Sequence, residues 1–180
     1  MAAEAEPARS RAVAELARRI DGIPVAMVTT VAPDDVLRCR PMLLETLQPD
    51  ATLVFLTHLT SQKATDVHRD PRVNVAFVGD KGDRYVSIGG TATAVHDVAR
   101  FHALWHPTYR AWFPGGPDDP DSAIFTVAID RVDYWDVPTS RFVRLWGVVR
   151  ALATGQVAES GDRTTIEFGE EGVHVERDER

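Results

Sequence analysis

The sequence contains almost no cysteine. Among its 180 residues only Cys39 carries a thiol, so no intramolecular disulfide can stabilise the fold. Disulfides are common in oxidising compartments and rare in the cytosol, so this composition favours a reducing compartment, and we expect a cytoplasmic protein. Cys39 precedes Arg40 on an expected strand and points to the opposite face, which favours a buried structural thiol over a nucleophile.

Long apolar runs and an excess of positive charge are also missing. No run approaches the ~20 apolar residues that cross a bilayer, and the start MAAEAEPARS has no hydrophobic signal core. The formal net charge of −7 argues against a general nucleic-acid surface or an anionic membrane. The sequence therefore predicts neither a membrane nor a nucleic acid as a partner.

Familiar catalytic and metal-binding motifs are absent from the sequence as well. It contains no P-loop, no Ser-His-Asp set and no Cys/His cluster. His102 and His106 have a spacing that can bind a metal on a helix, but no third ligand is near and Pro107 disturbs the geometry. We therefore predict no metal site, and no catalytic acid or base can be named. A protein whose cofactor carries redox chemistry needs none of these motifs.

What the sequence does contain is a series of short apolar segments separated by turn residues. After an expected disordered leader at residues 1–7, the spacing of apolar residues predicts a helix over residues 8–20. The expected strands cover residues 25–31, 36–47, 52–57, 72–78 and 85–96, followed by 123–129 and 132–137 as one bent strand or two. Short connections favour antiparallel pairing, and Gly89-Gly90 indicates a bulge at a barrel corner. We therefore expect a mainly β fold, a small closed or partly closed barrel with peripheral helices.

Helices are expected between and after these strands. Residues 60–69 form a short helix that ends before Pro71, and Asp97 begins another helix that Pro107 kinks or splits. A final helix runs from Thr139 or Ser140 to Gly155, so a single domain covers residues 8–155. Residues 156–180 form an acidic C-terminal extension in which a weak hairpin can form before a terminal tail.

The stretch from residue 38 to residue 63 carries the candidate ligand site. One strand places Arg40-Pro41-Met42 in a row, the next ends in Phe55-Leu56-Thr57, and a loop then brings Ser61-Gln62-Lys63 into a helix. Cations beside the free backbone donors of a helix start suit a phosphate group, and apolar strand ends can seat a flat ring. This pattern predicts a phosphorylated aromatic ligand such as flavin mononucleotide (FMN).

Simpler interpretations of the same residues stay open at this point. Arg40 and Lys63 can be solvated cations, and Ser61 can serve only as a helix cap. We expect Trp105, Trp112 and Trp146, which stand at helical positions, to take part in core or dimer packing. His58 lies just beyond Leu56-Thr57 and can touch a ligand, but we expect it to be a surface loop residue.

The order of these motifs resembles a known family. R-P-M on one strand, F-x-T-x-x-x-S-x-K entering a helix, and D-P-R-V before the next strand are similar to the pyridoxamine 5′-phosphate oxidase-like FMN-binding split barrels. The strings DRYV (83–86), AWFPGG (111–116) and YWD (134–136) resemble the bacterial general-stress-protein branch. The resemblance covers residues 20–155. Each motif is weak alone, and their order and spacing together are more specific.

The resemblance implies a fold, an assembly and a site. The fold would be a six-stranded antiparallel split β-barrel, and the assembly a homodimer with two flavin sites at its interface. Arg40 and Lys63 would hold the phosphate with Ser61 and Gln62. The residues that would flank the isoalloxazine ring are Pro41, Met42, Leu56 and Thr57. Tyr85 falls where the family often has a residue that contacts the ring, and Trp135 matches a tryptophan that covers the flavin from the other subunit.

The chain also departs from that family pattern. True pyridoxamine phosphate oxidases carry an Arg-x-His pair soon after the tryptophan, whereas residues 136–142 contain no histidine. Glu45 replaces a lysine that often follows the first-strand arginine. We therefore expect an FMN-binding oxidoreductase of the general-stress type that does not oxidise vitamin B6. A non-catalytic flavin-binding or buffering protein is the alternative, as is a split barrel that uses FAD, a deazaflavin or haem.

Overall fold

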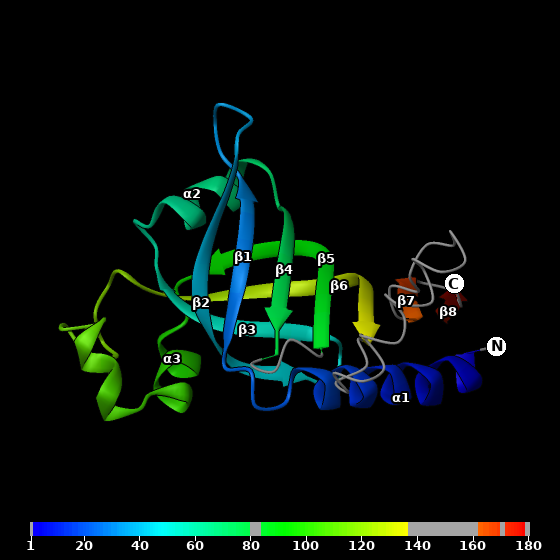
Figure 1. The fold of residues 1–180 in the computed structure, drawn as a ribbon. Helices are drawn as coiled ribbons and strands as arrows, with labels where there is room; N and C mark the ends of the chain where they lie inside the picture. Colours follow the sequence, from blue (N-terminus) through cyan, green and yellow to red (C-terminus); the bar gives the residue numbers. More distant parts are fainter. Residues whose placement is uncertain (1, 80–83, 137–161, 170–171, 179–180) are drawn as a thin grey trace, which may run out of the picture.

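Strands make up most of the structure, a computed structural model that describes residues 2–79, 84–136, 162–169 and 172–178 (Figure 1). The strands are β1 (Val25–Val31), β2 (Leu37–Gln48), β3 (Thr52–His58), β4 (Arg72–Val78), β5 (Arg84–Val95), β6 (Ser122–Asp136), β7 (Asp162–Gly169) and β8 (Gly172–Asp178). The helices are α1 (Ala2–Ile20), α2 (Gln62–Arg69), α3 (Val98–Leu104) and the 3₁₀ helix η1 (Pro107–Ala111).

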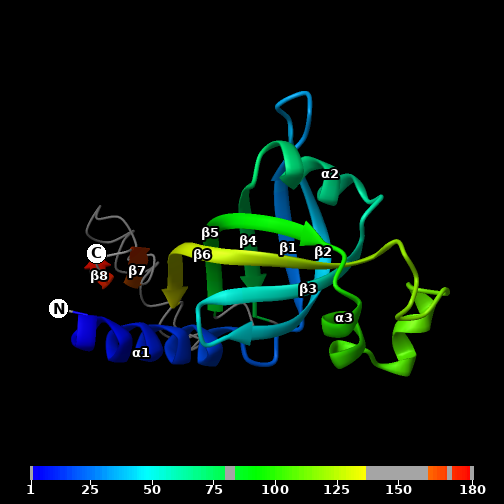
Figure 2. The same ribbon diagram turned by 180° about the vertical axis from the view of Figure 1, so that it is seen from behind.

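Six of the strands close into a barrel, as expected from the sequence. Their order is β3-β2-β1-β4-β5-β6, and β3 pairs again with β6. All of these pairings are antiparallel. Seen from behind, β3 runs alongside β6, while the antiparallel pair β7–β8 extends the sheet beyond β6 (Figure 2). The six-stranded antiparallel split barrel is therefore confirmed.

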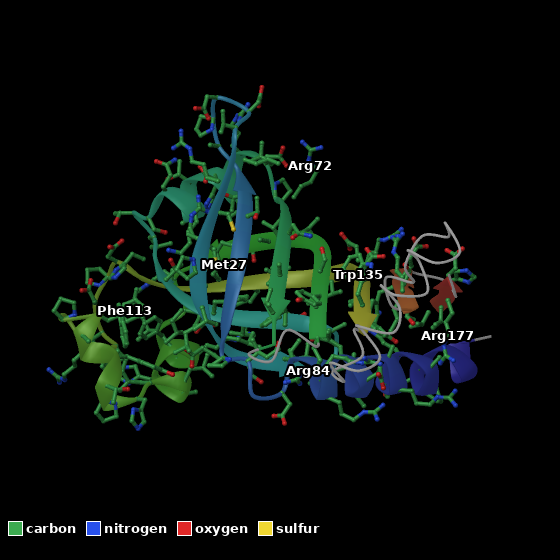
Figure 3. The ribbon with its side chains drawn as sticks, viewed as in Figure 1. Met27, Arg72, Arg84, Phe113, Trp135 and Arg177 are labelled. Carbon is green, nitrogen blue, oxygen red and sulfur yellow. The ribbon has the colours of Figure 1, made fainter. Side chains whose placement is uncertain are left out.

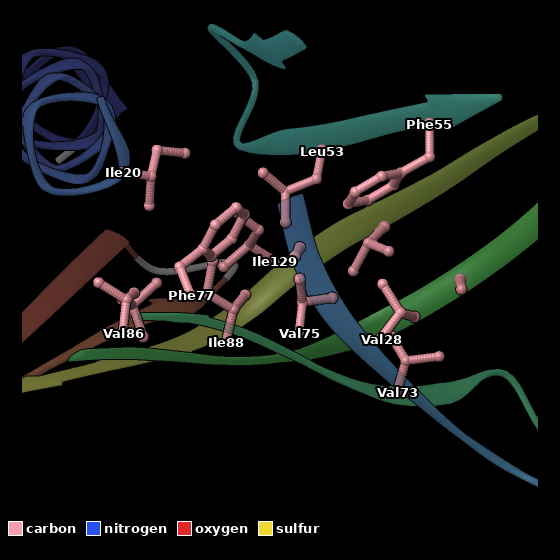
Figure 4. Packing of buried hydrophobic residues seen from close by; sticks show 14 of the residues in the cluster. Ile20, Val28, Leu53, Phe55, Val73, Val75, Phe77, Val86, Ile88 and Ile129 are labelled. Carbon is pink, nitrogen blue, oxygen red and sulfur yellow. The ribbon is translucent and has the colours of Figure 1, made fainter. Parts of the chain in front are cut away.

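Alternation along the strands fills the barrel with apolar side chains. Val28, Val75 and Ile88 are fully buried, and Phe55 meets Phe125 edge to face with ring centroids 6.3 Å apart. Figure 4 shows Val28, Phe55, Val75 and Ile88 converging between the strands, with Ile20 of α1 closing one end. Burying a side chain of this size is worth roughly 1.5–3 kcal/mol, so this cluster is the main source of stability.

The glycine pair in β5 has the predicted effect. The register between β5 and β6 shifts between Gly89 and Gly90, and the extra residue of the expected bulge is Asp130 on β6, opposite the glycine pair. A Cβ atom on Gly90 would lie 2.2 Å from the carbonyl oxygen of Ala128, so β6 approaches too closely for any side chain at that position. The bulge lets β6 continue as one long bent strand that pairs with β3 in its first half and β7 in its second.

The N-terminal helix is longer than the sequence predicts. It begins at Ala2 and not at residue 8, so the segment expected to be a disordered leader is helical. Alanine, the strongest helix former, recurs in that segment, and the helix continues through Pro7, which lies inside it and removes one backbone donor. At the other end, Arg84 of β5 donates to the carbonyl oxygens of Arg19 and Asp21 at 3.1 and 3.0 Å.

Two further expectations concern the final helix and the cysteine. The final helix expected from Thr139 or Ser140 to Gly155 lies outside the described residues. Cys39 is exposed, so the interpretation as a buried thiol is wrong. Its side chain does point away from the face of Arg40, but that is the outer face of the barrel and no other part of the described chain covers it. No helix among the described residues is both long and apolar enough to pass through a lipid bilayer.

A second, smaller apolar cluster lies outside the barrel. We call residues 97–121, which contain α3 and η1, the insert; it connects β5 to β6 and lies beside the barrel in both views (Figures 1 and 2). Phe101 and Phe113 of the insert pack on Val54 of β3 and Ile124 of β6. Asp97 caps α3 by accepting a hydrogen bond from the Arg100 amide, as expected. The insert is therefore fixed against the outside of β3.

Candidate functional site

The start of α2 lies beside the end of β3. Ser61 is the N-cap, with its hydroxyl accepting from the Ala64 amide, so its predicted capping role is confirmed. The same hydroxyl lies 3.2 Å from the Thr57 hydroxyl of β3, which ties the helix to the strand. The amides of Gln62 and Lys63, the first two residues of the helix, have no intrahelical partner and can bind an anion at this end of α2.

Arg40 is held at this rim by a buried acid. Its guanidinium donates to the Thr30 hydroxyl at 2.7 Å and lies 3.5 Å from a carboxylate oxygen of Asp66. Thr30 donates to the same carboxylate at 2.6 Å, and Gln62 donates to the other oxygen at 2.9 Å. Asp66 and Thr30 are fully buried, while the Arg40 side chain is 22% exposed. Asp66 therefore fixes two of the predicted phosphate-binding residues, Arg40 and Gln62.

Lys63 contrasts with Arg40, because it has no such partner. Within the described part of the chain it makes no hydrogen bond or ion pair, although its side chain is half-buried. Burial lowers the pKa of Lys63, and the Arg40 guanidinium lowers it further. An anion bound beside Lys63 would relieve both effects. We call Arg40, Ser61, Gln62, Lys63 and Asp66 the phosphate corner.

A pocket of about 260 Å³ opens next to the phosphate corner. The predicted residues that line it are Pro41, Met42, Leu56, Thr57 and Lys63. The residues that were not predicted are Leu43, Glu45, His58, Tyr109, Trp112 and Phe113. The volume is at the small end for organic ligands, so a flat ring fits only if part of the ligand extends outside.

A wall contributed by the insert was missed by the sequence interpretation. The register between β2 and β3 shifts between Leu44 and Thr46, so Glu45 is the extra residue of a bulge. The Tyr109 hydroxyl donates to Glu45 Oε2 at 2.7 Å. Burial raises the pKa of Glu45, and burial together with this hydrogen bond raises the pKa of Tyr109 to about 12. The phenol therefore stays protonated at neutral pH. We call Glu45, Tyr109, Trp112 and Phe113 the aromatic wall.

His58 connects the aromatic wall to the barrel. Its ring lies 4.6 Å from the Phe113 ring, and Nε2 is 3.0 Å from the Trp112 carbonyl oxygen. Its other nitrogen is 3.2 Å from Asp121, whose carboxylate also accepts two hydrogen bonds from Thr60. His58 is thus more than the surface loop residue that the sequence predicted. Trp112 has an exposed side chain at the pocket edge, so it does not pack in the core of the chain, and its expected part in dimer packing stays a prediction.

Tyr85 and Trp135 do not line this pocket. They pair with each other across β5 and β6, and the Arg163 guanidinium lies 5.8 Å from the Trp135 ring centre. Pro41 of the pocket pairs with Met27, which pairs in turn with Ala76 on β4. Figure 3 shows Phe113 and Trp135 on opposite sides of Met27. Within one chain, the predicted ring-contacting residues therefore form two separate groups.

A larger groove of about 530 Å³ runs between α1 and the β7–β8 pair. Arg11, Arg19 and Arg177 line it, but none of the predicted ligand residues does. No group of three or more potential metal ligands occurs within the described ranges. His102 lies 2.7 Å from Asp118, an exposed contact of a histidine with a single carboxylate. The phosphate corner and its pocket are therefore the candidate site.

Comparison with known proteins agrees with the fold. A family model described as "Pyridoxamine 5′-phosphate oxidase like" matches residues 11–159. The protein bli-3 of Neurospora crassa is 28% identical over 115 residues, which cover 59% of this chain and 54% of bli-3. The chain thus spans about half the length of the curated relative it matches.

Solved structures with the same fold share little sequence with the chain. An FMN-binding protein related to pyridoxamine 5′-phosphate oxidase, from Nostoc punctiforme, has a TM-score of 0.63 at 16% identity and covers 94% of this chain and 96% of its own. The general stress FMN/FAD-binding protein of Xanthomonas citri has a TM-score of 0.60 at 22% identity. The match covers 75% of this chain and 92% of the Xanthomonas protein. The likeness to these structures supports the fold, and the family match covers most of the sequence. The chain belongs to the pyridoxamine 5′-phosphate oxidase-like family.

Proposed function

We propose that this chain is a flavoprotein that binds FMN with its phosphate in the phosphate corner. Arg40, Lys63 and the first amides of α2 would hold the phosphate, with Ser61 and Gln62 completing its hydrogen bonds. The observation that carries this proposal is Lys63, a half-buried ammonium without an anionic partner in the described part of the chain. Such a group is costly to bury unless a ligand neutralises it. The flavin of the Nostoc and Xanthomonas proteins supports the choice of ligand.

The ring would lie against the pocket lined by Pro41-Met42 and Leu56-Thr57. Because the pocket holds only part of such a ligand, we propose that a second copy of the chain covers the remainder. The outer sheet face supports a homodimer: its exposed apolar side chains are Val25, Met27, Leu43, Val78 and Tyr85, which are 37–54% exposed. In a dimer through this face, Tyr85 and Trp135 of one copy would meet the flavin in the other.

Bound flavin would supply hydride or electron transfer, while the chain binds the cofactor, orients it and excludes water. We propose an oxidoreductase of the general-stress type that works in the cytoplasm. The exposed, unpaired Cys39 suits a reducing compartment. Steady-state turnover with a nicotinamide donor separates this function from flavin storage without catalysis. The absorption spectrum of the purified protein separates FMN or FAD from a deazaflavin or haem.

The test is a flavin titration of the protein and of the double variant Arg40→Ala/Lys63→Ala. Removing two charge-assisted contacts to a phosphate should weaken FMN binding by about 100-fold or more. Arg72→Ala is the matched control, because Arg72 is an exposed arginine that pairs with Asp70 away from the pocket. Its affinity should stay within about twofold of the parent. Equal affinities of parent and double variant would refute the site, and a monomeric mass in solution would refute the dimer.

A further inference from the structure

The pocket carries opposite charges contributed by different elements. Lys63 comes from α2, whereas Glu45 comes from the bulge of β2. Burial, and after it the Arg40 guanidinium, lowers the pKa of Lys63, whereas burial raises the pKa of Glu45 against the opposing effect of the Tyr109 hydrogen bond. Each charge therefore depends on its own neighbouring residues. The same pocket can bind an anion at Lys63 and a cation at Glu45.

Glu45 has capacity left for a ligand. Its Oε2 accepts the Tyr109 hydroxyl at 2.7 Å, and Oε1 accepts no hydrogen bond from any described residue. Tyr109 fixes the carboxylate in one orientation and, with its pKa near 12, stays a donor to it. A half-buried carboxylate with one unused oxygen binds an N–H group or a cation more strongly than an exposed one does.

Trp112 supplies an aromatic surface at the same place. Its side chain is 65% exposed at the pocket edge, although the neighbouring Phe113 is 6% exposed and packs on Phe101. The His58 ring holds the Trp112 carbonyl, so the backbone that carries the indole is fixed. An exposed indole on a fixed backbone beside a carboxylate can cover a flat cation, because the ring face attracts positive charge.

We propose that Glu45, Tyr109 and Trp112 form a substrate subsite that selects a flat group bearing an amidinium or ammonium. Glu45 binds the cation or its N–H donors, and Trp112 stacks over the attached ring. Substrates that present a phosphate or carboxylate at this end are excluded by the Glu45 charge. The inference rests on the proposed function in one respect: the flavin would occupy the Lys63 side of the pocket and leave this side to the substrate.

Two small probes of equal ring size and opposite charge test the subsite. Benzamidine and benzoate are titrated into the full chain, with and without FMN, and binding is followed by calorimetry and tryptophan fluorescence. Benzamidine should bind at least about 10-fold more tightly than benzoate, which is the size of one charge-assisted hydrogen bond. Adding FMN should not displace the bound benzamidine.

Variants then assign the effect to Glu45. Glu45→Gln keeps an acceptor for Tyr109 but removes the charge, and it should weaken benzamidine binding by about 10- to 100-fold without weakening benzoate binding. Glu167→Gln is the matched control, since Glu167 is half-exposed in β7 and pairs with Arg131. That control should bind both probes as the parent does. Circular dichroism checks that each variant is folded.

Several results would overturn the subsite. They are equal affinity for the two probes, absence of benzamidine binding, an unaffected Glu45→Gln variant, or displacement of benzamidine by FMN. FMN affinity measured in the same samples distinguishes this failure from that of the proposed function. Loss of charge selection with FMN binding intact refutes the subsite alone. Absence of FMN binding together with charge-selective benzamidine binding refutes the proposed function alone.

Discussion

Polar contacts hold the phosphate corner in place, whereas ring contacts hold the aromatic wall. In the phosphate corner, Thr30, Arg40 and Gln62 all contact the fully buried Asp66. In the aromatic wall, the Phe113 ring lies 5.1 Å from the Phe101 ring and 4.6 Å from the His58 ring. One side of the pocket thus depends on satisfying a buried charge, and the other depends on apolar packing outside the barrel.

The difference has a consequence for stability. The phosphate corner is continuous with the barrel core, because Thr30 lies on β1 and Asp66 faces it from α2. Three of the four residues of the aromatic wall, Tyr109, Trp112 and Phe113, belong to the insert, whose small cluster is separate from that core. Segments with few buried contacts open locally at lower free energy than core strands do. We therefore expect changes in the corner to alter global unfolding and changes in the wall to alter local opening.

Asp66→Ala should have the largest effect. It leaves Arg40 without its buried counter-charge and Thr30 without its acceptor, so the free energy of unfolding should fall by about 3–5 kcal/mol. Urea denaturation followed by circular dichroism measures the change. Asp118→Ala is the control, because the Asp118 side chain is 78% exposed, and its denaturation midpoint should hardly move. If both variants unfolded like the parent, the phosphate corner would not be part of the stabilising core.

Phe113→Leu should have an intermediate and local effect. The variant loses the edge-to-face contact with Phe101 and several ring carbons, which together contribute about 1–2 kcal/mol. Hydrogen exchange should become faster in residues 97–121, while the amides of β1 and β4 keep their protection. Trp112→Leu is the control, since that exposed side chain should change stability by less than about 0.5 kcal/mol. Uniformly faster exchange through the barrel would show that the insert is not a separate unit.

The same contrast explains what could be predicted from the sequence. Much of the phosphate corner lies within residues 40–63, where strand ends, a cap and a helix start bring side chains together over short separations. The aromatic wall depends on contacts between distant residues, such as Tyr109 with Glu45, which are 64 positions apart. No local pattern specifies such a pair.

The two bulges show which single-residue features of the sheet can be predicted from the sequence and which cannot. The bulge at Gly89-Gly90 was predictable, because paired glycines in a strand indicate a close approach. The bulge at Glu45 interrupts the ordinary strand sequence Leu44-Glu45-Thr46 and carries no such signal. It sets where the Glu45 carboxylate lies, so the charge at that end of the pocket could not be inferred. The spacing of turns predicts the barrel, whereas the alanine-rich start of α1 has too few apolar residues at helical spacing to be distinguished from a disordered leader.

Glu45→Gln should have the smallest effect on stability. The sign of this effect shows whether the charge of Glu45 stabilises its side of the pocket, as the charge of Asp66 stabilises the other side. Burial raises the pKa of Glu45 in the folded state, so the folded state binds this proton more tightly than the unfolded state does. The protonated Glu45 carboxyl therefore contributes its full stabilisation at a pH below its pKa in the unfolded state. This contribution is lost as the pH rises through its pKa in the folded state. Because the side chain is partly exposed, solvent screening keeps the difference below about 1 kcal/mol.

The glutamine variant lacks this titration. It should therefore unfold at a slightly higher urea concentration than the parent at pH 7, and the gain should disappear near pH 4. Glu167→Gln, which loses an exposed ion pair with Arg131, should show no such gain at pH 7. A glutamine variant that is less stable than the parent at pH 7 would mean that the ionised carboxylate stabilises the wall, as Asp66 stabilises the corner. A small gain would instead mean that the charge of Glu45 opposes folding slightly, which leaves ligand binding as the reason for placing a carboxylate in the pocket.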